Sequence, residues 1–279
     1  MRYVSFAAGG RSSWGVLQGE QIVDVGSAAG VPETLAGYLA AGSPDLTAAM
    51  ESGETISLSD VTYLPVIPRP HKILCVGLNY KNHILEMGHV LPSFPTLFSK
   101  FATALIGDGD GILYPTVSTA VDYEAELAVV IGKTASKVAA AEALDYVGGY
   151  TILNDISIRD YQRRTSQFMQ GKTFDRTTPV GPCMVTLDEI ENPLDLGIKL
   201  TLNGEVMQDS STADLIFNVP ELIEYISTFM TLEPGDIIAT GTPGGVGTAR
   251  DPQVYLKPGD TVEIEVAGIG RLSNQVVTE

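Results

Sequence analysis

The chain has 279 residues, of which 44% are hydrophobic and 18% charged, a composition typical of a globular protein and not of a disordered or fibrous one. Its 17 Lys and Arg residues face 34 Asp and Glu, and the resulting net charge of −17 argues against binding to nucleic acids or anionic membranes. The two cysteines lack metal-site or disulfide spacing, and neither a signal peptide nor a membrane-spanning apolar run is evident, so we expect a soluble cytoplasmic protein with buried free thiols.

Residues 1–68 are predicted to form a small N-terminal α+β domain. Strands are predicted over 2–8, 13–18 and 21–25, with turns that contain glycine, followed by short helices over 34–41 and 46–51. The segment from Leu64 to Pro70 then carries three prolines, which deny backbone hydrogen bonds and stiffen the chain. We therefore place a domain boundary there, with 69–279 as the second domain.

The second domain is predicted to be rich in strands. These are expected over 72–76, 96–99, 124–131, 149–154, 183–186, 198–202, 205–209, 236–240, 261–266 and 270–276, and helices over 80–87, 137–144, 157–168 and 219–229. Asn203-Gly204 between two alternating strands is a strong hairpin signal. Since helices and strands do not alternate regularly, an α+β fold with a mixed or antiparallel sheet is favoured over a Rossmann-type one.

A histidine and a glutamate follow the first of these strands. His83 and Glu86 are three residues apart, so on a helix they share a face and can hydrogen-bond. A carboxylate beside an imidazole raises its basicity and fixes its tautomer, which suits a base that activates water. A surface histidine beside an ordinary helical glutamate has the same pattern.

Two carboxylates, Glu124 and Glu126, lie two residues apart in a predicted strand that enters an apolar core. Because side chains alternate along a strand, both point to the same face, where like charges repel and burial adds to the cost. A hard divalent cation such as Mg²⁺ would compensate, and Asp155 at the end of a later strand offers a third oxygen ligand. The spacing also fits a solvent-facing row of acids, since Asp122 shares their parity.

Basic residues gather in and before the turn-rich loop 170–182. Lys172 in this loop could pair with an anionic substrate or a developing enolate, or it could be solvated. Arg159, Asp160, Arg163 and Arg164 lie on the preceding predicted helix, where Arg159 and Asp160 could form a structural pair.

A glycine-rich segment, 240–247, follows a strand near the C-terminus. It lacks the Gly-Lys-Ser/Thr ending of a P-loop, so nucleotide binding is rejected. Its backbone N–H groups and the Thr242 hydroxyl could instead hold a substrate carboxylate.

Five of these segments occur in an order that is highly specific. They are Val76-Gly-Leu-Asn-Tyr-x-x-His83-x-x-Glu86, Asp122-Tyr-Glu124-x-Glu126-Leu-Ala, Asn154-Asp155-Ile-Ser-x-Arg159-Asp160, Gly171-Lys172-x-Phe-Asp and Gly241-Thr242-Pro-x-Gly-Val-Gly247. Together they resemble the fumarylacetoacetate hydrolase family from about residue 70 to the C-terminus. The first 68 residues resemble the small N-terminal domain found in part of that family.

The resemblance implies a mixed β-sheet roll that holds one Mg²⁺ or Mn²⁺, usually in a homodimer. By motif it implies Glu124, Glu126 and Asp155 as metal ligands, His83 and Glu86 as a water-activating pair on a lid, Lys172 near the metal, and Thr242 as a contact to the substrate carboxylate.

These roles predict an acylpyruvate-type C–C hydrolase, with fumarylpyruvate as the preferred substrate. A 2-oxo acid would chelate the ion, a water activated by His83 and Glu86 would attack the distal carbonyl, and the ion with Lys172 would stabilise the departing pyruvate enolate. Arg159 or Arg163 would contact a second carboxylate. Oxaloacetate decarboxylation and isomerisation of 2-hydroxyhepta-2,4-diene-1,7-dioate are alternatives that need no attacking water. A keto-acid-binding protein without activity is an alternative of another class.

Overall fold

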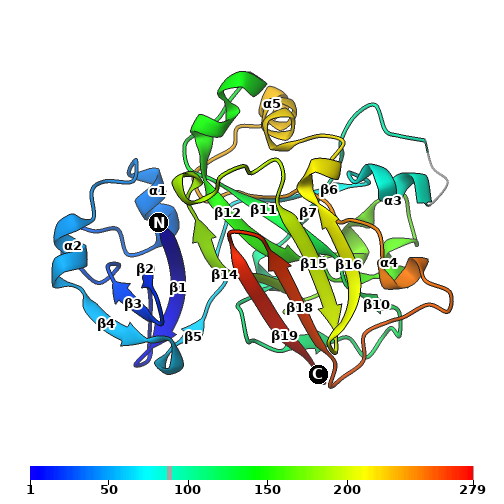
Figure 1. Cartoon of the computed structure of the whole chain (residues 1–279), viewed down its shortest axis with the longest axis horizontal. Coiled ribbons are helices and arrows are strands. Elements are labelled where there is room, and N and C mark those ends of the chain that lie inside the picture. The colour runs from blue at the N-terminus through cyan, green and yellow to red at the C-terminus, as the bar shows by residue number, and fades with distance from the viewer. Residues whose placement is uncertain (87–89, 279) are drawn as a thin grey trace.

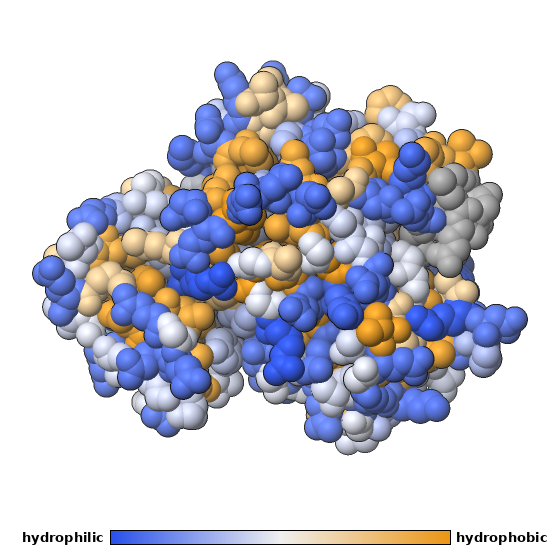
Figure 2. All heavy atoms as spheres, in the orientation of Figure 1, coloured by the Kyte–Doolittle hydropathy of each residue, from blue (hydrophilic) through white to orange (hydrophobic). Residues whose placement is uncertain are grey.

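The computed structural model describes residues 1–86 and 90–278, except for the side chains of His83, Leu85 and Glu86. A small N-terminal unit lies on one side of the molecule, and α3 and α4 lie on the opposite side, on the larger second part (Figure 1). Polar residues cover much of the face in Figure 2, where a notch in the outline separates the two parts. No helix within the described ranges is long and apolar enough to cross a membrane.

The N-terminal unit is built around an aromatic cluster. Its elements are β1 (Arg2–Ala8), β2 (Arg11–Gln18), β3 (Gln21–Asp24), α1 (Leu35–Ala40), α2 (Thr47–Ser52), β4 (Glu54–Ser57) and β5 (Thr62–Tyr63). Trp14 is buried between Tyr3 and Tyr38, with ring centroids 5.8 Å and 4.8 Å away. The three predicted strands and two predicted helices are confirmed, whereas β4 and β5 were not predicted.

One 12-stranded sheet runs through both parts of the chain. Its main path is β4-β3-β2-β1-β14-β12-β11-β17-β6-β7, with β5 paired to β1 and β8 to β14. The strands of the second part are β6 (Ile73–Gly77), β7 (Thr96–Lys100), β8 (Leu105–Ile106), β11 (Ala125–Ile131), β12 (Val147–Asn154), β14 (Thr178–Val185) and β17 (Ile237–Ala239). Most pairs are antiparallel, but β6–β17 and β8–β14 are parallel, so the predicted α+β fold with a mixed sheet is confirmed.

A second sheet of five strands has the order β16-β15-β18-β19-β9. Its strands are β9 (Ile112–Tyr114), β15 (Gly197–Leu202), β16 (Glu205–Ser211), β18 (Thr261–Val266) and β19 (Gly270–Thr278), and β10 (Val121–Asp122) pairs separately with β13 (Ser157–Ile158). The predicted hairpin is present, since Leu202 pairs with Glu205 and both Asn203 and Gly204 have positive φ.

Strand β11 is the centre of the core. Its residues alternate between two apolar clusters, with Leu127 and Val129 in one and Ala128 and Val130 in the other, and all are fully buried. A strand buried on both faces is rigid, because side chains pack against it from two directions. The residue that directly precedes β11, Glu124, is therefore held in a fixed position.

Helices are few and short. Besides α1 and α2, they are α3 (Lys81–Glu86), α4 (Arg159–Gln162) and α5 (Val219–Phe229), with 3₁₀ turns at Leu58–Asp60, Ala102–Ala104, Ala140–Tyr146, Phe168–Gly171, Leu187–Glu189, Thr212–Asp214 and Gly247–Ala249. The helix α5 begins with a capping box of Asn218 and Glu221, and its residues Leu222, Ile223 and Ile226 are buried.

Two helix predictions are wrong. Residues 157–168 form β13, the four-residue α4 and an irregular segment, and the Thr165 hydroxyl donates to the Gln167 carbonyl and accepts from its N–H. Such local side-chain bonds compete with helix formation. Residues 137–144 begin with Lys137 in the left-handed region, so only the 3₁₀ turn Ala140–Tyr146 forms.

Candidate functional site

Three carboxylates meet at one end of the large sheet. Ligand atoms of Glu124, Glu126 and Asp155 all lie within 4.8 Å of one another, and the three side chains are buried. Glu124 directly precedes β11 and Glu126 lies on it, while Asp155 directly follows β12. Since β11 and β12 pair antiparallel, with Ala125 opposite Asn154, the start of one strand meets the end of the other. Thirty residues of intervening chain are thus bridged by the sheet register.

Three cationic side chains pair with two of these acids, Glu124 and Asp155. Lys172 Nζ lies 2.6 Å from Oε2 of Glu124 and 2.8 Å from Oδ2 of Asp155. Lys100 Nζ lies 2.6 Å from Oδ1 of Asp155, and Arg159 Nη2 lies 2.7 Å from Oε1 of Glu124. Four of the six carboxylate oxygens therefore already have a cationic partner at short distance.

The pKa values of Asp155 and Glu126 are shifted in opposite directions. Burial opposes ionisation of Asp155, but the charges of Lys100 and Lys172 outweigh it and lower the pKa of Asp155. Burial, followed by the charges of Asp155 and Glu124, raises the pKa of Glu126 well above its usual range. Glu126 accepts a backbone N–H of the glycine-rich loop at 2.8 Å and forms no ion pair with another described residue. Of the three acids, Glu126 is therefore the one whose ionised form an added positive charge would stabilise most.

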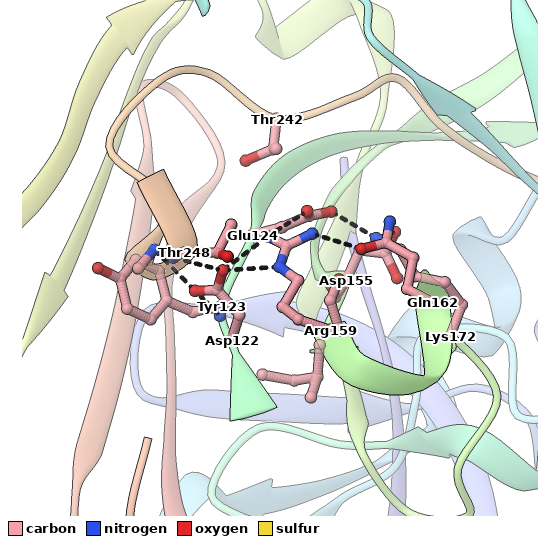
Figure 3. A network of polar contacts seen from close by, with 12 residues as sticks. Asp122, Tyr123, Glu124, Asp155, Arg159, Gln162, Lys172, Thr242 and Thr248 are labelled. Atoms are coloured by element: carbon pink, nitrogen blue, oxygen red, sulfur yellow. Dashed lines mark hydrogen bonds and ion pairs between the residues drawn. The ribbon is translucent and has the colours of Figure 1, made fainter. Parts of the chain in front are cut away.

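Arg159 links the acids to the glycine-rich loop (Figure 3). Its Nε donates to Oδ2 of Asp122 at 2.7 Å, and its Nη1 donates to Gln162 at 3.0 Å. The Asp122 carboxylate also accepts the backbone N–H groups of Gly247 and Thr248, at 2.8 Å and 3.0 Å. Asp122 is thus saturated by structural bonds, and it lies on β10, not on the strand of the glutamates.

A pocket of about 360 Å³ opens onto this group. Residues from distant parts of the chain line it, among them Phe98, Glu124, Glu126, Arg159, Lys172 and Thr242. Phe98 and Phe168 supply an apolar wall, and their rings meet edge to face with centroids 5.8 Å apart. The pocket therefore joins a charged floor to an apolar side, as a small organic anion requires.

The predicted site residues fare differently in the structure. Glu124, Glu126, Asp155 and Lys172 are brought together. Thr242 lines the same pocket, with its hydroxyl accepting the Gln208 amide at 2.8 Å, and Arg159 and Arg163 line it as well.

Two further outcomes concern residues nearby. His83 and Glu86 lie on α3, and their side chains are outside the described residues. The predicted Arg159–Asp160 pair is wrong, because Asp160 instead accepts from Ser118 at 2.6 Å and lies 3.9 Å from Arg164.

Sequence reasoning missed Lys100. This lysine ends β7, its side chain is fully buried, and it donates to Asp155. Alternation along β7 places Lys100 on the same side as Phe98, which lines the pocket. The signal available in the sequence was a lysine at the end of a strand, two residues after Phe98 and therefore on the same face of that strand.

The chemistry of the donor set fits a divalent cation. Carboxylate oxygens are the ligands that Mg²⁺ and Mn²⁺ prefer, and three of them converge here from rigid strand ends. Burial and the charges of Asp155 and Glu124 outweigh the charge of Lys172 at Glu126 and raise its pKa, so this acid is only partly compensated. The acidic group could therefore hold a metal ion.

Comparison with known proteins assigns the family. Residues 72–277 match the model of the fumarylacetoacetate (FAA) hydrolase C-terminal domain, and residues 1–65 match the model called Rv2993c-like, N-terminal. The chain belongs to the fumarylacetoacetate hydrolase family. The resemblance of the five motifs to this family is thereby confirmed.

Relatives within the fumarylacetoacetate hydrolase family differ in their named activities. The mitochondrial oxaloacetate tautomerase FAHD2A of Bos taurus is 44% identical over 253 residues, covering 88% of this chain and 81% of its own. The fumarylacetoacetate hydrolase of Exiguobacterium antarcticum has a TM-score of 0.90 at 35% identity, with both chains fully covered. The maleylpyruvate hydrolase of Sphingobium sp. SYK-6, solved with manganese (II) and pyruvate, has a TM-score of 0.82 at 31% identity, covering 100% and 99%.

Proposed function

We propose that this protein is a metal-dependent enzyme that interconverts the enol and keto forms of oxaloacetate. The observation that carries the proposal is Lys172, a buried ammonium group held between Glu124 and Asp155 at the floor of a pocket. A cation fixed beside a metal-binding group suits an enolate, whose charge lies on an oxygen that the ion would also hold. The similarity to oxaloacetate tautomerases supports oxaloacetate as the 2-oxo acid.

The chain supplies binding groups and charge. Glu124, Glu126 and Asp155 would hold Mg²⁺ or Mn²⁺, which when bound would chelate the carboxylate and keto oxygens of a 2-oxo acid. Thr242 lines the pocket, and we propose that its hydroxyl contacts the substrate carboxylate. Lys172 then stabilises the oxygen that becomes negative when the proton leaves C3. We propose that His83, with Glu86 as its partner on α3, accepts the C3 proton and returns a proton to the enolate oxygen, which gives the enol.

A second candidate is hydrolysis of an acylpyruvate, with fumarylpyruvate as the predicted substrate. The His83 and Glu86 pair favours it, because the pair suits activation of water. The structural similarity to a maleylpyruvate hydrolase also supports it. Both reactions pass through an enolate at the same position, so the binding residues are shared. His83→Ala should then lower kcat for hydrolysis far more than it changes KM.

One set of assays separates the candidates. The protein is stripped with EDTA, reloaded with Mg²⁺ or Mn²⁺, and mixed in turn with enol oxaloacetate, fumarylpyruvate and acetylpyruvate. Loss of the enol absorbance reports conversion, and lactate dehydrogenase with NADH reports pyruvate. Metal without protein gives the background rate of each reaction.

The outcomes point in different directions. Faster loss of enol oxaloacetate without pyruvate supports the tautomerase, and pyruvate from oxaloacetate indicates a decarboxylase instead. Pyruvate from the acylpyruvates indicates the hydrolase. Binding without any conversion indicates a keto-acid-binding protein. An undiminished rate in EDTA would contradict the metal requirement.

We also propose that the protein assembles as a homodimer, as the motifs imply for this family. Multi-angle light scattering after size-exclusion chromatography gives the mass directly, to be compared with 29.6 kDa for one chain.

A further inference from the structure

One arginine that lines the pocket, Arg163, is not paired with Glu124, Glu126 or Asp155. Three cationic side chains line the pocket within the described residues, namely Arg159, Arg163 and Lys172. Arg159 is occupied by Asp122 and Glu124, and Lys172 by Glu124 and Asp155. Of the three, Arg163 alone has no carboxylate within ion-pair distance among the described residues.

Arg163 lies one helical turn beyond Arg159. It is the C-cap residue of α4, and its backbone N–H donates to the Arg159 carbonyl at 3.1 Å. Residues four apart share a helix face with their Cβ atoms about 6 Å apart. The two arginines therefore succeed one another along the pocket, Arg159 at the acids and Arg163 further out. This offset is comparable to the length of a short dicarboxylic acid.

The Arg163 side chain is also held in place. Its Nη2 donates to the Thr248 hydroxyl at 2.8 Å, and that hydroxyl lies 3.2 Å from the Tyr255 hydroxyl. The Thr248 backbone N–H is in turn bound by Asp122 at 3.0 Å. The Thr248 hydroxyl is a neutral partner, so it orients the guanidinium of Arg163 without neutralising its charge. The other N–H groups of Arg163 remain available as charged hydrogen-bond donors.

The neighbouring Arg164 provides a contrast. Its guanidinium carbon lies 3.4 Å from the centroid of the Tyr161 ring, and its Nη2 lies 3.9 Å from Asp160. Arg164 is therefore committed to contacts within its own segment, and it does not line the pocket.

We propose that Arg163 binds a second, distal carboxylate of the substrate, so that the site selects 2-oxo dicarboxylates over 2-oxo monocarboxylates. The inference rests on the proposed binding of a 2-oxo acid at the acidic group. A guanidinium matches a carboxylate with two parallel hydrogen bonds, which gives both affinity and orientation. It also supplies local attraction for a dianion that the net charge of −17 would otherwise repel.

The test compares two acids of equal length in binding, without turnover. Isothermal titration calorimetry on the Mg²⁺-loaded protein measures the Kd of 2-oxoglutarate and of 2-oxopentanoate, which lacks only the distal carboxylate. The variants are Arg163→Met, Arg163→Lys and the matched control Arg164→Met, each checked for an unchanged Tm.

The expected pattern is specific to one acid and one arginine. Arg163→Met should weaken 2-oxoglutarate about tenfold or more and 2-oxopentanoate less than about twofold. Arg163→Lys should keep part of the preference, and Arg164→Met all of it. Equal weakening of both acids by Arg163→Met, or of neither, would overturn the inference.

Failure of the proposed function would look different. If the wild type prefers 2-oxoglutarate and Arg163→Met removes the preference, the distal site stands even if oxaloacetate is not converted. If neither acid binds the Mg²⁺-loaded wild type, 2-oxo acid binding itself fails, and the distal site fails with it.

Discussion

Lys100 Nζ lies 2.6 Å from Oδ1 of Asp155, and both side chains are fully buried. The other oxygen of this carboxylate, Oδ2, is 2.8 Å from Lys172. Both oxygens of Asp155 are therefore paired with a lysine, and of the two lysines only Lys172 lines the pocket. The lysine that sequence reasoning missed is thus a support for one of the three acids.

We expect Lys100→Met to destabilise the fold. Removing one partner of a buried ion pair leaves the other charge uncompensated, which typically costs about 3–5 kcal/mol. Urea unfolding in EDTA measures the loss. Lys133→Met, at an exposed position, is the control. In a double-mutant cycle with Asp155→Asn, the combined loss should be smaller than the sum. A loss no greater than that of the control would contradict the role.

The raised pKa of Glu126 links stability to pH and to metal. Because its pKa in the folded protein is above the usual 4.5, the folded state holds a proton that the unfolded state has already released. Without metal, stability should therefore fall as the pH rises from about 5 toward the raised pKa. A bound cation should offset this loss, so the rise in Tm on adding Mg²⁺ should grow with pH.

Glu126→Gln isolates this effect. In EDTA the variant should match or exceed the wild type in Tm at pH 8, since the repulsion between buried acids is removed, and Mg²⁺ should no longer raise its Tm. Differential scanning fluorimetry across pH 5–8 gives both curves. A full Mg²⁺ response in the variant would argue against Glu126 as a ligand.

The glycine at position 247 leaves no room for a side chain. A Cβ there would lie 1.7 Å from the Val254 carbonyl oxygen and 2.7 Å from Oδ1 of Asp122. Gly247→Ala should therefore cost about 1–3 kcal/mol of unfolding free energy and lower kcat/KM by moving the pocket loop. At Gly197 the nearest atom to an added Cβ is 3.9 Å away, so Gly197→Ala is a matched control that should be nearly silent.

Neither cysteine should react in the folded protein. Both thiols are buried, and burial raises the pKa of Cys183 to about 11 and that of Cys75 well above its usual range. With DTNB at pH 8 the native protein should release almost no thionitrobenzoate, and the urea-unfolded chain should release two equivalents. Rapid labelling of the native protein would show that one of these thiols is accessible.

Much of the architecture was predictable because periodicity is a local property. The alternation around Leu127 and the Asn203-Gly204 turn determine a strand and a hairpin wherever they occur. Segment 157–168 was misassigned because its helical pattern competes with a local Thr165 turn and with strand pairing to β10, a partner from elsewhere in the chain.

The site was predictable in its ligands and less so in its partners. That Glu124 and Glu126 point to the same face follows from their spacing in the sequence. The ion pair between Arg159 and Asp122, in contrast, depends on how α4 and the glycine-rich loop come together in the fold. Lys100 joins the site only through the tertiary pairing of β7 with β6. Such contacts between distant segments have no local signature.

Because β1 pairs with β14, the first 65 residues cover the edge that β14 would otherwise expose in the large sheet. Tyr3 pairs with Met184, and β14 in turn pairs with β12, the strand that leads to Asp155. Without β1, the end of β14 would present open hydrogen-bonding groups that other chains can extend. A fragment that begins at residue 66 should therefore aggregate, as sedimentation would detect, although family models divide the chain at that point.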